Sequence, residues 1–228
     1  MRTLRNVRVM ALAGGQVMLP GVTEYVWDAA PLSATAFFAA GETDDGRASQ
    51  ILLSSLARIR LLTSGNGQQI LTIDAEDMGV IDLPVLRTIG VLDGQDLVRI
   101  HLDSGGTVLL PVLTDLSQLA IDLDGESALT LPAASGDLLA ATVSIEAAAT
   151  LTLSNLDRLV DSDFELLGTL IIPSAVEFRN NELRLLGTSE LNAGSLGQLV
   201  GGSFFLKDEA RFVAPALAAY QNPDDASD

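Results

Sequence analysis

From about residue 51 onward the sequence repeats one phrase, in which an apolar strand ends at Pro, Ser or Gly and Leu-x-x-apolar follows. A fixed period of roughly 20–30 residues is typical of proteins built from stacked structural repeats. The repeat therefore predicts one repeat domain over residues 51–220, and it constrains the fold more than any local motif does. The anchor residues of the phrase are separated by 30, 27, 21, 22, 19, 21 and 21 residues, and they are Ser54, Pro84, Pro111, Pro132, Ser154, Pro173, Gly194 and Pro215.

The composition fits thin, equal layers better than one globular centre. Hydrophobic residues make up 48% of the 228-residue chain but aromatic residues only 4%, so Leu, Ile, Val and Ala must fill the core. Bulky rings usually fill a single large core, whereas a stack of repeats buries aliphatic side chains between neighbouring repeats. We expect an all-β protein, because no segment shows the sustained 3.6-residue apolar period of a helix.

Each repeat predicts two strands, the first ending at the anchor and the second about ten residues further on, as at Val98–Leu102. The expected fold is a single-stranded parallel β-solenoid of about eight coils of about 21 residues, with a non-repeating N-terminal β segment. The Leu-x-x-apolar segments can form short 3₁₀ or helical turns. The two longest repeats predict protruding loops at Ser64–Gln69 and Ser104–Gly106.

Residues 1–50 do not fit the period, and we expect them to cap the repeat domain or to anchor it to a partner. Strands are predicted at Val7–Leu12, Gln16–Leu19 and Thr23–Trp27. The segment has three arginines before its first acidic residue and the only tryptophan, and basic arms are often interaction tails. Residues 221–228 form an acidic tail. The predicted partner-binding residues are Arg2, Arg5, Arg8, Tyr25, Trp27, Phe37 and Phe38.

The formal net charge of −17, from 30 acidic and 13 basic residues, argues against a nucleic-acid partner. Nucleic-acid binding normally requires a basic face. The absence of cysteine excludes disulfides and thiolate metal sites. No apolar segment reaches transmembrane length, and the stretch after Arg8 is too short for a convincing signal peptide. We therefore expect neither membrane insertion nor classical export.

The repeated phrase apolar-x-apolar-Pro-x-Leu-x-x-apolar, with a Gly or Asp corner and a second strand, resembles the β-helical leucine-rich repeats of receptor L-domain type. The resemblance covers about residues 51–220 and implies a right-handed parallel β-solenoid. It does not imply a receptor function, because the receptor domains carry disulfides and this chain has no cysteine. The Asn that marks ordinary leucine-rich repeats is also not regular here.

Two acidic motifs suggest chemistry, and each has a simpler interpretation. Asp122–Ser127 resembles the start of a calcium loop, but Ala133 stands at position twelve, where an EF-hand requires Glu, so we expect a solvated turn. Asp161, Asp163 and Glu165 alternate, so a strand would place them on one face, where paired carboxylates can hydrolyse glycosides. We favour a solvated surface, because no basic or aromatic sugar platform accompanies them.

His101 is the only histidine, which restricts any His-based triad or multi-His metal site to this residue. Its alternation with Leu97 and Arg99 predicts an exposed position on a strand. Gly90–Gly94 lacks the Gly-Lys-Ser/Thr ending of a phosphate loop. We therefore expect no catalytic residue, no cofactor and no metal.

These observations favour a non-enzymatic structural protein that attaches to a larger protein assembly through residues 1–50 and can form a homo-oligomer. Its most specific form is a surface protein of a bacteriophage virion, either a capsid decoration or a tail-associated protein, synthesised in the cytoplasm. The alternative is a bacterial cell-surface adhesin or a module that binds glycan or protein. A third hypothesis is a carbohydrate-active enzyme that uses Asp161, Asp163 or Glu165, although enzymatic function must rest on site chemistry rather than on fold.

Overall fold

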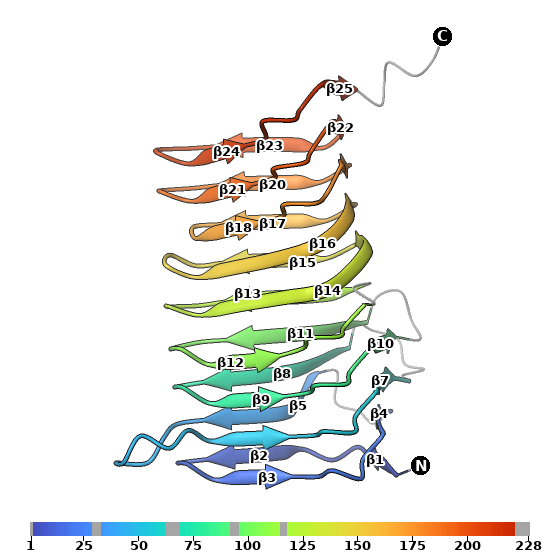
Figure 1. Cartoon of the computed structure of the whole chain (residues 1–228), viewed down its shortest axis with the longest axis vertical. Helices are drawn as coiled ribbons and strands as arrows, with labels where there is room; N and C mark the ends of the chain where they lie inside the picture. The colour runs from blue at the N-terminus through green and yellow to red at the C-terminus, as the bar shows by residue number, and fades with distance from the viewer. Residues whose placement is uncertain (1, 29–32, 63–68, 92–95, 115–117, 222–228) are drawn as a thin grey trace.

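The computed structural model describes residues 2–28, 33–62, 69–91, 96–114 and 118–221. Throughout this part of the chain the structure is all-β and contains no helix. The strands stack along the long axis of the molecule, with the N-terminus at one end and the C-terminus at the other (Figure 1). A helix long and apolar enough to cross a membrane is accordingly not found in the described ranges.

The strands form four sheets, which we name by their size or first strand. The nine-stranded sheet contains β2 (Val9–Leu12), β5 (Ser33–Ala40), β8 (Ile70–Glu76), β11 (Leu97–Leu102), β13 (Leu119–Leu123), β15 (Thr142–Ile145), β17 (Asp163–Leu166), β20 (Glu182–Leu185) and β23 (Ser203–Leu206). The β1 sheet contains β1 (Thr3–Arg5), β4 (Glu24–Trp27), β7 (Arg58–Leu61) and β10 (Thr88–Val91). The β3 sheet contains β3 (Gln16–Met18), β6 (Gln50–Leu52), β9 (Val80–Asp82) and β12 (Thr107–Leu109). The eight-stranded sheet contains β14 (Ala128–Leu139), β16 (Thr150–Val160), β18 (Thr169–Ile171), β19 (Glu177–Arg179), β21 (Glu190–Asn192), β22 (Gln198–Val200), β24 (Arg211–Val213) and β25 (Ala219–Gln221).

In the N-terminal half the chain passes through three sheets in rotation. Strands β1, β2 and β3 lie in different sheets, and each pairs with the strand three places further along the chain, as Leu4 does with Tyr25 and Val17 with Ile51. Every pairing between the named strands is parallel. One full turn of the chain, here called a coil, therefore adds one strand to each sheet.

Two long strands change this pattern in the C-terminal half. Strand β16 pairs with β18 through Thr150–Thr152 and with β19 through Arg158–Val160, so one strand takes two of the places in a coil. Strand β14 pairs with β16 along both parts, with register shifts between Leu131 and Ser135 and between Gly136 and Asp137. The bend of these strands joins two sides of the molecule in the single eight-stranded sheet (Figure 1).

The core is one continuous column of aliphatic side chains inside the stack. Alternate residues of each strand point inward, and the parallel register places equivalent residues of successive coils on top of one another. Each fully buried leucine or isoleucine of such a column contributes about 1.5–3 kcal/mol of burial free energy. One column consists of Ile51, Ile81 and Val108 in the N-terminal half and of Leu129, Leu151, Leu170, Leu191 and Phe212 in the C-terminal half.

The repeated phrase forms a tight turn and a third strand, so the prediction of two strands per repeat was wrong. The amide of Leu86 donates to the carbonyl of Leu83 at 3.2 Å, which closes a turn around the anchor Pro84 rather than a 3₁₀ helix. Both leucines are fully buried. The last residue of the phrase, Ile89, then points inward from the short strand β10. Leu83, which follows β9, and Leu86, which precedes β10, thus both pack into the core at the corner between the β3 sheet and the β1 sheet.

The expected non-repeating N-terminal segment is also wrong, since residues 1–50 supply the first strands of three sheets. Strand β2 pairs with β5, and β3 pairs with β6, in the same register direction as the later coils. The turn around Pro20, closed by the amide of Val22 on the carbonyl of Leu19, matches the anchor turns of the repeats. A loop between Glu42 and Ala48, closed by an antiparallel bridge between these two residues, lengthens this coil. The extra residues hide the repeat period in the sequence.

The loop predicted at Ser104–Gly106 does not protrude, because it forms a tight turn in which the Gly106 amide donates to the carbonyl of Asp103 at 2.8 Å. A Cβ atom on Gly106 would lie 1.9 Å from the carbonyl oxygen of Ala75 in the preceding coil. Glycine is therefore required here by close approach of two backbones. The other predicted loop, at Ser64–Gln69, lies outside the described residues except for Gln69, which is buried.

Buried polar side chains connect successive coils at one corner of the stack. The Asn181 amide nitrogen donates to the carbonyl of Leu159 at 2.9 Å, and its oxygen accepts from the amide of Ser162 at 3.0 Å. The hydroxyl of Ser162 in turn accepts from the amide of Ala141 at 3.0 Å. These bonds satisfy backbone groups that the corner removes from the strand ladders, where an unpaired buried group would be destabilising.

Candidate functional site on two outer faces

The outer side of the nine-stranded sheet, here called the acidic face, carries six carboxylates, two arginines and one histidine among its described strand residues. Parallel register stacks them in columns, so that Asp74, His101 and Asp122 follow one another on β8, β11 and β13. Like charges on neighbouring strands are destabilising unless cations separate them. The charged outward residues of these strands are Asp74, Glu76, Arg99, His101, Asp122, Asp163, Glu165, Glu182 and Arg184.

His101 links three coils of this face. Its Nδ1 atom lies 2.7 Å from Asp74 Oδ1 in the preceding coil, and its Nε2 atom lies 3.1 Å from Asp124 Oδ2 in the following coil. A second carboxylate, that of Glu76, lies 3.9 Å from Nδ1. Beside this group, Arg99 Nε lies 3.0 Å from Asp122 Oδ2. The half-buried imidazole is therefore held between carboxylates on both of its ring nitrogens.

The carboxylates determine the charge of this histidine. The hydrogen bond to Asp74, assisted by that to Asp124, raises the pKa of His101 to about 9, although partial burial opposes the shift. Burial first and the nearby charge of Asp74 second raise the pKa of Glu76, and burial raises that of Asp122. In neutral solution the imidazole is protonated and neutralises part of the acidic column. The prediction of an exposed strand position is confirmed for the strand, but the side chain is half-buried and ion-paired.

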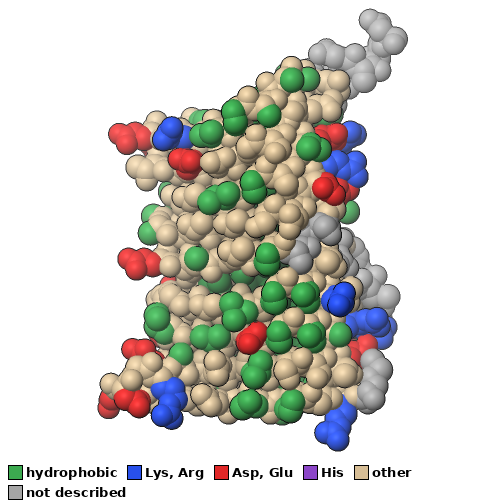
Figure 2. Space-filling view, viewed as in Figure 1, with side chains coloured by type: hydrophobic (Ala, Val, Ile, Leu, Met, Phe, Trp, Pro, Cys, Tyr) green, Lys and Arg blue, Asp and Glu red, His purple; other side chains and the backbone are tan. Residues whose placement is uncertain are grey.

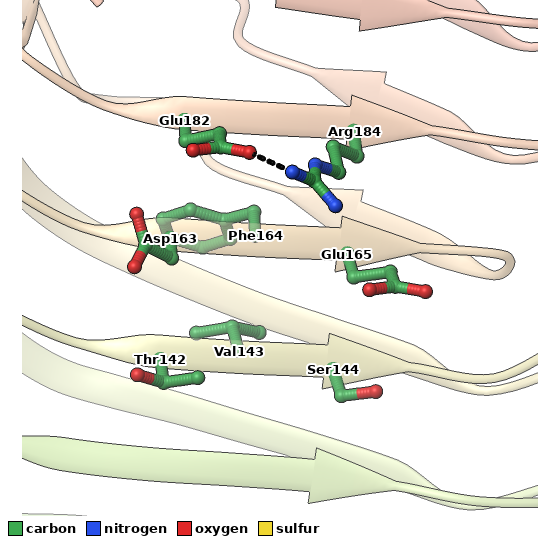
Figure 3. A pocket seen from close by; sticks show the side chains of 8 residues that line it. All are labelled: Thr142, Val143, Ser144, Asp163, Phe164, Glu165, Glu182 and Arg184. Carbon is green, nitrogen blue, oxygen red and sulfur yellow. Dashed lines mark ion pairs between the residues drawn. The ribbon is translucent and has the colours of Figure 1, made fainter.

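Further along the acidic face, three strands line a shallow hollow that contains the alternating acids Asp163 and Glu165. Strands β15, β17 and β20 contribute Ser144, Glu165 and Arg184 in one column, with Asp163 and Glu182 beside them (Figure 3). Arg184 forms an ion pair with Glu182 of its own strand at 2.5 Å. The hollow is open to solvent and combines acceptor oxygens with one guanidinium group.

An adjoining hollow of about 410 Å³ adds an aromatic ring to this group. Phe205 of β23 stands next to Arg184 in register and is 52% exposed. Glu165 and Ser203 also line this hollow. The sequence-based expectation that no basic or aromatic group accompanies the acids was therefore wrong, because the strands that supply Arg184 and Phe205 follow one and two coils later.

A second outer face carries few charges. It is formed by the β3 sheet and by the adjoining strands β18, β21, β24 and the first parts of β14 and β16. We call it the weakly charged face. Its outward strand residues include only three charged ones, of which Glu190 and Arg211 lie 3.7 Å apart, leaving Asp82. In Figure 2 hydrophobic and uncharged side chains cover the middle of this side, and charged ones lie mostly along the borders. Met18 is 61% exposed and Leu109 is 45% exposed.

Asp82 is the one charged residue without a charged neighbour among the described outward strand residues of this face, and its surroundings are apolar. It lies in register between Leu52 of the preceding coil and Leu109 of the following coil. Burial raises the pKa of its carboxyl group above the ordinary value. A carboxylate flanked by leucines is partly desolvated, and a partner that covered it would need to supply a hydrogen-bond donor.

The predicted basic arm is spread along the edge of the first coil. Arg2 and Arg8 are exposed, and Arg5 is exposed and ion-paired with Asp28. The hydrogen bond from Arg5 lowers the pKa of Asp28. These arginines therefore remain accessible, but the structure does not gather them into one patch with the predicted aromatic residues.

The aromatic residues predicted to bind a partner mostly belong to the core. Tyr25 and Phe37 are fully buried and their ring centroids lie 4.9 Å apart, and Trp27 is 5% exposed. The Tyr25 hydroxyl donates to the carbonyl of Val7 at 2.9 Å, and burial raises its pKa. Only Phe38 is half-buried with an outward position on the nine-stranded sheet. The structure contradicts the prediction for the three buried rings, because their side chains belong to the hydrophobic core and are not accessible to a partner.

The two acidic motifs lie in the turn after β13 and on the outward face of β17. Asp124 begins the turn after β13, where it contacts His101, and Ser127 closes it with its amide on the Asp124 carbonyl, which confirms the predicted turn. Asp163 and Glu165 share the outward face of β17, as predicted. Asp161 lies in the preceding corner at positive φ, where Asn180 donates to it.

Sequence reasoning did not find the cluster around His101. Its members lie 27 and 23 residues away in sequence, which are coil lengths, so a periodicity search for outward residues at that spacing would have brought them together. The register depends on turn lengths in individual coils, and the phrase fixes only the inward residues.

Comparison of the chain with protein-family models, with curated proteins and with solved structures finds no match.

Proposed function

We propose that the chain is a non-enzymatic structural protein that associates through its weakly charged face, with further copies of itself and with a larger protein assembly. The observation that carries the proposal is the contrast between the two outer faces of one stack. We further propose that the fold is a single-stranded parallel β-solenoid of the leucine-rich-repeat type.

The charge of the molecule supports association through one side only. At a net charge of −17, copies of the chain repel one another, and the described strands of the acidic face carry six carboxylates against two arginines and one histidine. The weakly charged face combines exposed Met18 and Leu109 with threonines on a regular parallel β-surface, as at Thr150 and Thr152. Protein interfaces are depleted of charged residues at their centre, as this face is.

The edge of the first coil supports attachment as well. Strands β1, β2 and β3 are terminal in their sheets, so one side of each lacks a strand partner among the described residues. Exposed strand edges readily pair with another chain. Met10 and Leu12 of β2 are each more than half exposed at this edge. Attachment through the N-terminal region therefore rests on strand edges and aliphatic side chains rather than on the predicted aromatic residues.

The mass of the protein in solution tests the self-association. Sedimentation equilibrium should give a mass above the 23.9 kDa monomer that rises with concentration. Replacing Leu109 and Thr152 by lysine should return the mass to that of the monomer, since buried unpaired charges oppose association. The matched control replaces Thr142 and Ser144 of the acidic face by lysine and should leave the mass unchanged. A monomeric wild type, or equal effects of both pairs, would contradict the proposal.

The most specific form of the proposal remains a surface protein of a bacteriophage virion. Electron cryo-microscopy of particles assembled with the wild-type chain should show its density, and particles assembled with the Leu109→Lys, Thr152→Lys chain should lack it. Full attachment of this variant would exclude the weakly charged face as the docking surface.

A second candidate is a glycan-binding module, which the hollow beside Phe205 favours. An exposed ring beside Arg184, Glu165 and Glu182 offers one apolar surface and several hydrogen-bonding groups, the combination that ligand sites use. Loss of glycan binding in Phe205→Ala, with binding intact in Phe38→Ala, would support it. The carbohydrate-active enzyme stays a third hypothesis, and it requires a polysaccharide-cleaving activity that Asp163→Asn removes.

A further inference from the structure

A cluster of potential metal ligands lies on the acidic face, and neither of the two candidate functions uses it. Three potential ligand atoms, one each from Asp74, Glu76 and His101, lie within 4.8 Å of one another in the described part of the chain. An imidazole nitrogen with two carboxylate oxygens is a donor set that suits zinc and similar divalent transition metals. We propose that Asp74, Glu76 and His101 form a binding site for a zinc ion that joins two successive coils.

The distances are close to those that a metal requires. Tetrahedral zinc with ligands at about 2.0–2.2 Å places its ligand atoms roughly 3.3–3.6 Å apart. His101 Nδ1 lies 2.7 Å from Asp74 and 3.9 Å from Glu76, so these separations bracket the required value. The Glu76 side chain is 34% exposed and can rotate toward the site, while solvent supplies the remaining ligand.

The surroundings already orient the histidine for this role. Asp74 and His101 are direct register partners on β8 and β11, which fixes their backbones relative to each other. Asp124 accepts from Nε2 on the other side of the ring. A metal-bound histidine normally donates its second ring nitrogen to a carboxylate, which fixes the tautomer and the ring orientation.

Zinc binding would replace one proton on the imidazole. In the metal-free protein the protonated imidazole donates Nδ1–H to Asp74 and Nε2–H to Asp124, and zinc would replace the proton on Nδ1 while Nε2–H stays with Asp124. Arg99 is held by Asp122 at 3.0 Å and so is occupied by another carboxylate. Exchange of one proton for a divalent cation adds one net positive charge to a column of carboxylates, which lowers their mutual repulsion.

Nuclear magnetic resonance of the imidazole tests the site directly, because the full chain contains a single histidine. In EDTA-treated protein at neutral pH, one equivalent of zinc chloride should shift the Nδ1 signal of His101 and leave a protonated Nε2. Manganese chloride should broaden the same signals through its unpaired electrons. Zinc titration without any change at the imidazole would overturn the proposal, even if zinc bound elsewhere on this acidic chain.

Calorimetric titration with zinc chloride separates this site from adventitious binding to carboxylates. Wild-type protein should bind one zinc ion per chain, and His101→Asn and Glu76→Gln should each weaken binding at least tenfold. Asp124→Asn should weaken it by about tenfold through loss of ring orientation. Glu165 lies on the same face, on β17, four strands away from β8 in the sheet. Glu165→Gln is therefore the matched control and should bind zinc as tightly as the wild type does. Equal affinity in wild type and His101→Asn would refute the site.

Discussion

The ion pairs of His101 predict that stability decreases as the pH rises through about 9 in metal-free protein. The hydrogen bond to Asp74 raises the pKa of the folded imidazole to about 9, above its ordinary value of 6.5. The folded state therefore binds the proton more tightly than the unfolded state does. The stabilisation is fully present below about pH 6.5 and is lost as the pH rises through 9.

The size of the effect follows from the two pKa values. A pKa of about 9 against 6.5 corresponds to about 3 kcal/mol in favour of the folded, protonated state. The side chain is 24% exposed, and solvent screening reduces the expected value to about 2 kcal/mol. That amount is large beside the total stability of a typical domain, which is about 5–15 kcal/mol.

Urea denaturation of wild type and His101→Gln at pH 6 and pH 10, in EDTA, measures this contribution. The variant lacks the titrating group, so other groups that titrate in this range cancel in the difference between the two proteins. The wild type should be more stable than the variant at pH 6, and this advantage should decrease by about 2 kcal/mol at pH 10. An advantage that is equal at both pH values would show that the carboxylates do not hold the protonated imidazole.

Three further substitutions test the stack itself by urea denaturation. Asn181→Ala removes two buried hydrogen bonds to backbone groups of the preceding coil and should cost about 2–4 kcal/mol; a loss below 0.5 kcal/mol would show that water replaces them. Gly106→Ala should lower the free energy of unfolding by more than about 2 kcal/mol, because its Cβ would clash with the Ala75 carbonyl. Gly90→Ala is the control and should be nearly neutral, because a Cβ there has no neighbour closer than 3.9 Å. Equal effects of the two substitutions would contradict the close approach at Gly106. Leu151→Ala should cost about 2–5 kcal/mol by leaving a cavity between coils, and a smaller loss would mean that neighbouring coils collapse onto it.

The inward half of the structure could be predicted from the sequence because it is periodic. The strands expected to end at the anchors are observed, as β9 (Val80–Asp82) before Pro84 and β21 (Glu190–Asn192) before Gly194 show. The second strands, such as Val98–Leu102, all belong to the nine-stranded sheet. Inward leucines must recur once per coil, so the period records them directly.

Strands β2, β3 and β4 lie where strands were predicted in residues 1–50. The third strand of the later repeats and the membership of residues 1–50 in the stack could not be predicted, because their signals are short or interrupted. Strand β10 has four residues, and its inward Ile89 is indistinguishable in sequence from the last apolar residue of a helical turn. In residues 1–50 the loop at residues 42–48 changes the spacing of the coils. Aromatic residues there suggested an exposed anchor, although ring size alone does not separate core from interface.

The outer faces could be predicted least, since they depend on register between coils of unequal length. The pairing of His101 with Asp74 and the pairing of Arg184 with Phe205 both follow from strand alignment rather than from any local motif. A shift by one residue would have exchanged inward and outward side chains. The weakly charged face likewise emerges only when outward residues of successive coils are placed side by side.

Cysteine labelling tests most directly whether the weakly charged face is the surface of association. The chain has no cysteine, so Thr152→Cys and Ser144→Cys each introduce a single thiol, on the weakly charged face and on the acidic face respectively. Both positions are half-buried, which makes their reaction rates with a maleimide comparable in the dissociated protein. On association, labelling of Thr152→Cys should slow at least tenfold while labelling of Ser144→Cys stays unchanged. Unchanged labelling at Thr152→Cys in the associated protein, or protection at Ser144→Cys instead, would contradict the account.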